Sequence, residues 1–243
     1  MSEFNQFDQQ GSVPTKETGS IISHAFEMYK GIFLYALLAI AISMAGSYAI
    51  QMLSGFDSQE MYEEMSSIGD FTRFDVWSTP GLVTYSGLSM ALSLLLTPLY
   101  VGVVYVANKY NNRESIKASD LFIGYKQNLV NILLYTVVSW LILGVAFSLC
   151  FLPGLFVMPF LLLGYPILLF ENASVGEALS KSFNIAKENY GTFLGTSLLG
   201  ILISVAGIVL CFVGIYITMY FYLAVMYSAY VAFIGKPRPL LKY

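Results

Sequence analysis

Long apolar stretches, each about as long as a membrane is thick, dominate the hydropathy pattern of this chain. A helix needs ~20 apolar residues to cross the ~30 Å hydrocarbon layer of a bilayer. Six stretches reach or nearly reach that length without Asp, Glu, Lys, Arg or His: residues 31–53, 81–107, 129–150, 154–170, 191–212 and 215–234. The pattern predicts an all-α integral membrane protein with six transmembrane helices, and a composition that is 57% hydrophobic and 11% charged supports it.

Three of the polar stretches that precede these spans have the form Ser-x-x-Phe-x-x-x-Lys. They are SHAFEMYK from Ser23, SDLFIGYK from Ser119 and SKSFNIAK from Ser180. A shift of 61 residues also aligns residues 119–170 with 180–231 without a gap. The repeat predicts three hairpins, each preceded by a short amphipathic interfacial helix, in units of about 20–110, 115–171 and 174–235.

The short helices carry the first candidate contacts. In the third, Ser174 and Glu177 form a capping box, and apolar residues recur at helical spacing on one face. Such a helix is expected to lie along the membrane surface, with its Phe in the apolar layer and its Lys reaching toward the headgroups. The candidate lipid or headgroup contacts are Lys30, Lys126, Lys187, Phe26, Phe122 and Phe183. Repeated structural anchoring is favoured over a binding site, because lysines that reach toward headgroups are common.

The distribution of basic residues predicts the orientation. All Lys and Arg except Arg73 lie before the first span, between spans two and three, between spans four and five, or after the last span. Because basic residues near span ends stay in the cytoplasm, both termini are expected on the cytoplasmic side of the membrane. Residues 1–19 are predicted to be a disordered tail, residues 20–243 a single six-span domain, and residues 54–80 an acidic outer loop.

Two stripes of side chains mark the last hairpin. Small residues repeat along span five, and tyrosines repeat along span six. Docking of the two stripes against each other explains them, because small residues let helices approach closely in lipid. Alternatively, the tyrosines line a cavity for a lipid or apolar ligand. The candidate packing residues are Ser197, Gly200, Ser204 and Gly207, and the candidate cavity residues are Tyr216, Tyr220, Tyr227 and Tyr230.

The sequence presents no catalytic constellation. His24 is the only histidine, so neither a histidine-containing metal cluster nor a Ser-His-Asp triad can form, and we expect His24 to be solvated. Cys150 and Cys211 occupy equivalent positions in the repeat, and buried free thiols are favoured over a disulfide. We expect no cofactor, no metal and no enzymatic activity.

The stretch around the third short helix resembles a known bacterial membrane family. Pro153-Gly154 opens a span, Pro166 lies near its end, and Glu171, Glu177-Ala178-Leu179, Ser182, Lys187 and Asn189 follow. These features resemble the membrane domain attached to some glycerophosphoryl diester phosphodiesterases, whose relatives also stand alone. The resemblance covers residues 150–200 and implies a membrane architecture without the catalytic barrel.

Function is therefore predicted by class. The leading prediction is a non-enzymatic accessory or scaffold protein that binds another membrane complex or organises membrane lipid. The alternative is a transporter or channel for a lipid-like or apolar solute, which the prolines in the spans, the repeat and the tyrosines favour. A lipid-modifying enzyme ranks third. A net charge of −3 gives no reason to expect a nucleic-acid partner.

Overall fold

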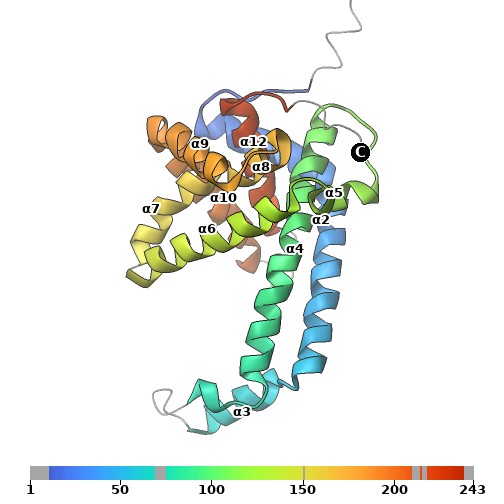
Figure 1. The fold of residues 1–243 in the computed structure, drawn as a ribbon, viewed down its shortest axis with the longest axis vertical. Helices are drawn as coiled ribbons and strands as arrows, with labels where there is room; N and C mark the ends of the chain where they lie inside the picture. Colours follow the sequence, from blue (N-terminus) through green and yellow to red (C-terminus); the bar gives the residue numbers. More distant parts are fainter. Residues whose placement is uncertain (1–10, 69–74, 150, 210–213, 215–217, 238–243) are drawn as a thin grey trace, which may run out of the picture. The chain divides into compact units, whose positions relative to one another are not determined.

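The protein, described by a computed structural model, is built of helices joined by short turns (Figure 1). The structure describes residues 11–68, 75–149, 151–209, 214 and 218–237, and those residues contain no strand. Its helices are α2 (Thr18–Ser54), α3 (Ser58–Ile68), η1 (Val76–Ser78), α4 (Leu82–Asn111), η2 (Ala118–Phe122), α5 (Ile123–Lys126), α6 (Leu129–Leu149), α7 (Phe151–Leu161), α8 (Gly164–Glu171), α9 (Val175–Glu188), α10 (Tyr190–Ala206), η3 (Gly207–Val209) and α12 (Phe221–Phe233).

The long helices fit a membrane protein, as the sequence predicts. By length and composition, α2, α4, α6 and the α7–α8 stretch (Phe151–Glu171) are able to cross a bilayer. The α9–α10 pair, bent by 106°, makes a fifth such segment if it is counted as one span. The sixth predicted span, residues 215–234, corresponds in the described residues to α12, which has 13 residues. The described residues thus provide four or five membrane-length segments where six were predicted.

The chain forms two compact units, residues 40–96 and residues 1–39 with 97–243. In the smaller unit, the rings of Phe56 and Tyr85 pack with centroids 4.8 Å apart at the turn that follows α2. Gly81 there has φ +74°, and a side chain on it would collide with the backbone at residues 54–56. In the larger unit, α6 packs along α7, and α10 packs on both α7 and α12.

The first of the three predicted short helices is not a separate element. Residues 20–30 belong to α2, which continues without a break through Lys30. The second and third short helices do end, at Lys126 and Glu188, and the breaks that follow contain Asn128 with φ +55° and Asn189 with φ −124°. Both asparagines lie two residues after the Lys of the repeat, where the first copy has Ile32. An isoleucine continues a helix, whereas asparagine tolerates the non-helical backbone that ends one.

The N-terminal segment also differs from expectation. Residues 1–10 lie outside the described residues, but residues 11–17, predicted to be disordered, contact the larger unit. Ser12 bonds to Asn111 of α4, and the main-chain carbonyl of Lys16 accepts a hydrogen bond from Thr192 of α10 at 3.4 Å. The Lys16 ammonium group lies 5.5 Å from the ring centroid of Phe233. These long-range contacts hold a segment whose own composition gives no reason for order.

Candidate functional site

The motif segments, residues 23–30, 119–126 and 180–187, present the same side chains to the surroundings. Phe26, Phe122 and Phe183 are 43%, 41% and 45% exposed. The residue before each phenylalanine is fully buried in all three copies: Ala25, Leu121 and Ser182. Lys30, Lys126 and Lys187 are all exposed. One side of each segment is therefore buried against the protein, and the other side exposes a phenylalanine ring and a lysine ammonium group.

Each motif segment packs on an equivalent helix of the repeat. The second and third segments pack on α4 and α7, which precede them in the chain, and the first packs on α12. The Phe183 ring packs on Phe160 of α7 with centroids 4.9 Å apart, and the Phe26 ring packs on Phe221 of α12 at 4.6 Å. Phe160 and Phe221 are related by the 61-residue shift. The equivalent position in α4 is Leu99.

The second motif segment lies against α4 so closely that backbones meet. A side chain on Gly102 of α4 would collide with the main chain of Leu121, and one on Gly124 would collide with the carbonyl of Pro98. Pro98 and Pro159 are related by the 61-residue shift. The second segment therefore lies beside Pro98, and the third bonds to Phe160, the residue after Pro159.

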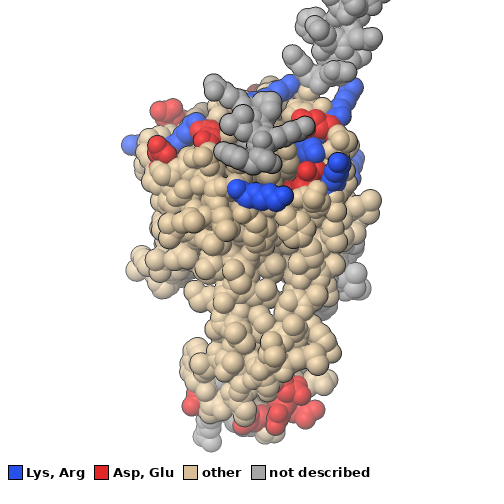
Figure 2. Space-filling view, turned by 45° about the vertical axis from the view of Figure 1, so that its right-hand side comes forward, with Lys and Arg blue, Asp and Glu red and all other residues tan. Residues whose placement is uncertain are grey.

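In each motif segment, the residue that follows the first serine forms a polar contact with another helix. In the second, Asp120 pairs with Lys109 at the end of α4 at 2.8 Å. In the third, Lys181 pairs with Glu171 at the end of α8 at 2.6 Å, so the charges are reversed. In the first, the equivalent residue is His24. Figure 2 shows that on the visible face the charged side chains of the larger unit gather at one end, above a surface free of charge.

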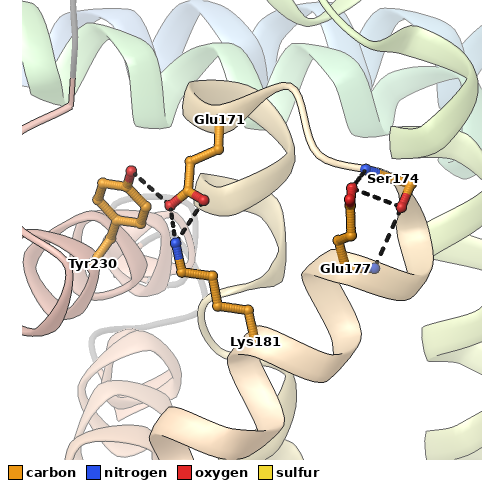
Figure 3. A network of polar contacts seen from close by, with 5 residues as sticks. All are labelled: Glu171, Ser174, Glu177, Lys181 and Tyr230. Atoms are coloured by element: carbon orange, nitrogen blue, oxygen red, sulfur yellow. Dashed lines mark hydrogen bonds and ion pairs between the residues drawn. The ribbon is translucent and has the colours of Figure 1, made fainter.

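Glu171 has a second partner from another helix. Figure 3 shows its carboxylate between Lys181 of α9 and Tyr230 of α12, and the Tyr230 hydroxyl donates to Oε1 at 3.2 Å. The neighbouring Ser174 and Glu177 form the predicted capping box, in which the Ser174 amide donates to the Glu177 carboxylate at 2.8 Å. A hollow of about 890 Å³ lies beside them, lined in part by Glu171 and Lys181. Glu171, Glu177 and Lys181 are the charged residues of its lining, and the other lining residues are uncharged.

His24 contradicts the expectation of a solvated residue. It is 6% exposed, its Nδ1 lies 2.8 Å from the Ser228 hydroxyl of α12, and its Nε2 lies 3.2 Å from the Ser12 carbonyl. The Asn111 amide donates to that same carbonyl and to the Tyr227 hydroxyl, which donates to Asn108. A hydrogen-bonded network thus joins the N-terminal segment, α2, α4 and α12.

Of the predicted tyrosine stripe, Tyr227 belongs to this network, whereas Tyr220 and Tyr230 contact other helices. Tyr220 and Tyr230 are 4% and 3% exposed, Tyr227 is fully buried, and Tyr216 lies outside the described residues. The Tyr220 ring packs edge-on against Tyr100 of α4 at 5.4 Å. These three tyrosines meet other helices, and a different set, described below, lines a cavity.

Ser197, Gly200 and Ser204 of the predicted small-residue stripe lie on the side of α10 that faces α12, and Gly207 begins η3. Ser197 and Ser204 are 0% and 7% exposed, and Gly200 and Gly207 are buried. The Gly200 position faces Tyr222 of α12, whose ring lies 3.0 Å from where a Cβ would be. The stripe therefore meets α12 at Tyr222, a residue outside the predicted tyrosine stripe.

The break between α7 and α8 is stabilised by side chains from other helices. Prolines 159 and 166 flank it, and the backbone groups that it frees need partners inside the protein. The fully buried Ser182 hydroxyl donates to the Phe160 carbonyl at 2.6 Å and accepts from the Leu163 amide at 3.3 Å. The Tyr135 hydroxyl donates to the Leu161 carbonyl at 2.9 Å. Sequence reasoning missed Ser182 and Tyr135, although Ser182 was visible as a polar residue on an apolar face.

The site defines a class, a helical membrane protein with repeated, surface-presented Phe and Lys. Comparison with protein-family models, curated proteins and solved structures finds no match. The resemblance to the phosphodiesterase membrane domain therefore stays a prediction. Among the described residues, no three His, Cys, Asp or Glu side chains lie close enough together to hold a metal ion. Cys150 and Cys211 lie outside the described residues.

Proposed function

We propose that the protein is a non-enzymatic accessory or scaffold protein of the bacterial cytoplasmic membrane that organises lipid through its three motif segments. In this proposal it crosses the membrane six times as three hairpins, with both termini in the cytoplasm, and the motif segments lie at the cytoplasmic surface. The observation that carries the proposal is the nearly equal exposure of Phe26, Phe122 and Phe183, each beside an exposed lysine.

The chemistry of each Phe and Lys pair suits an anionic lipid at the membrane surface. The aromatic ring enters the boundary between headgroups and acyl chains, and the lysine stem carries its ammonium toward phosphate. Each lysine near an anionic surface contributes about 1 kcal/mol. Three together therefore contribute about 3 kcal/mol, or roughly a hundredfold preference for anionic lipid.

The test is retention of anionic lipid by the purified protein. The protein is extracted into nanodiscs that contain phosphatidylglycerol and phosphatidylethanolamine, and mass spectrometry measures the lipid that remains bound. Replacing Lys30, Lys126 and Lys187 together by Gln is expected to remove the enrichment of phosphatidylglycerol. The matched control replaces the exposed Lys16, Lys117 and Lys236 by Gln, which makes the same change in net charge. Equal losses in both variants would show that overall charge, not the motif segments, selects the lipid.

The same experiment examines the partner-binding form of the proposal. A protein that copurifies in fixed ratio, and that is lost when Phe26, Phe122 and Phe183 are replaced by Ala, identifies the motif segments as a protein contact. Retention of that partner by the same variant excludes the motif segments as its binding site.

A transporter for a lipid-like solute remains the second candidate function. The break between α7 and α8 favours it, because interrupted helices in transporters supply backbone groups to a substrate. Ser182 and Tyr135 already bond to three of the backbone groups at this break, which favours the scaffold. A flux assay in liposomes separates the two functions.

A further inference from the structure

A cavity of about 150 Å³ lies beside the break, between α6, α7, α8 and α12. Its lining consists of aromatic, aliphatic and methionine side chains and one serine: Tyr135, Ser139, Trp140, Leu143, Met158, Leu161, Leu162, Tyr165, Tyr222 and Met226. Tyr135, Ser139 and Leu162 are buried, whereas Trp140 and Met158 are half-buried. Trp140 and Met158 are thus among the more exposed residues of the lining.

The cavity wall is mostly apolar, although three tyrosines and one serine line it, and two of these tyrosines form hydrogen bonds elsewhere. The Tyr135 hydroxyl donates to the Leu161 carbonyl, and the Tyr165 hydroxyl lies 3.1 Å from that of Thr136. Their polar atoms are thus engaged with the protein, and their rings form the wall. Met158 and Met226 add flexible thioether chains, which adapt to ligands of varied shape.

The position of the cavity along α6 indicates which medium surrounds its opening. Its residues on α6 lie near the middle of a helix that is long and apolar enough to cross a bilayer. Leu134, Leu141 and Val145 on the same helix are 52%, 64% and 62% exposed, so this part of α6 has a lipid-facing side. At this depth the surrounding medium is acyl chains, which are as apolar as leucine.

We propose that this cavity binds the end of one lipid acyl chain. An apolar cavity of about 150 Å³ stays dry and admits a benzene-sized ligand, so it has room for part of a chain and not for a headgroup. The proposal requires α6 to span the membrane, but it does not require headgroup binding by the motif segments. Either site can therefore fail without the other.

Trp140 provides a direct probe. The chain has two tryptophans, and replacing Trp77 in the smaller unit by Phe leaves Trp140, which lines the cavity, as the single tryptophan. A fatty acid brominated near its chain end, added to this variant in detergent micelles, is expected to quench Trp140 with saturation at one molecule per chain. An unbrominated fatty acid of equal length is expected to reverse the quenching by competition.

Two further variants on the Trp77→Phe background locate the quencher. Ser139→Leu fills the cavity and is expected to abolish saturable quenching, whereas the matched control Val137→Leu, on an exposed part of α6, is expected to keep it. Quenching that rises linearly without saturation, or that no unbrominated chain reverses, overturns the proposal even if Ser139→Leu does not fold. Equal saturable quenching in both folded variants also overturns it.

Discussion

Ser182→Ala tests whether one side chain from α9 holds the break between α7 and α8. The substitution removes a fully buried hydroxyl that serves the Phe160 carbonyl and the Leu163 amide. A buried polar group left unsatisfied costs about 1–3 kcal/mol, but hydrogen bonds between membrane helices average about 0.6 kcal/mol and reach about 1.7. For two groups we expect a loss of about 2 kcal/mol in the free energy of unfolding.

Denaturation by sodium dodecyl sulfate in mixed micelles, followed by circular dichroism, measures that loss. Ser180→Ala is the matched control, because it deletes the same hydroxyl two residues away at an exposed position. A loss below about 0.5 kcal/mol for Ser182→Ala, equal to that of the control, refutes the reasoning and shows that the break has other partners.

Three more perturbations test other contacts, the first two by the same unfolding assay and the third by amide hydrogen exchange. Lys181→Glu places two acidic groups together and is expected to destabilise by up to about 1 kcal/mol, and adding Glu171→Lys restores most of this, since the pair is partly exposed. Tyr227→Phe removes the hydroxyl between Asn111 and Asn108 and is expected to cost about 1–3 kcal/mol; no change contradicts the network. Gly102→Ala is expected to displace the second motif segment, seen as faster amide hydrogen exchange at residues 118–126; unchanged exchange contradicts the close approach.

The sequence predicted what depends on local composition. Apolar stretches predicted membrane-length helices because bilayer thickness sets their length, and the Ser174 capping box needs only residues three positions apart. The continuity of α2 through Lys30 was also readable, because Ile32 replaces the asparagine that follows the other two motif segments. This difference between the repeats is visible in the sequence alone.

The sequence did not predict what depends on distant partners. His24 is buried because Ser228, 204 residues away, and the N-terminal Ser12 complete its hydrogen bonds. A single histidine between Ser23 and Ala25 carries no signal of either partner. Likewise, helical spacing showed that the tyrosines of α12 share a side, but it did not show which neighbouring helix meets that side.

The contacts of the motif segments show how the repeats are arranged in the larger unit. The third segment packs through Phe183 on Phe160, and the first packs through Phe26 on Phe221, at nearly equal ring distances. Phe221 lies in α12, near the end of the chain. The first motif segment therefore packs on α12 in the same way that the third packs on α7. A linear array of repeats leaves its first and last members without such a contact. The larger unit instead joins its beginning to its end, so that none of the three motif segments lacks a helix to hold its phenylalanine and lysine at the surface.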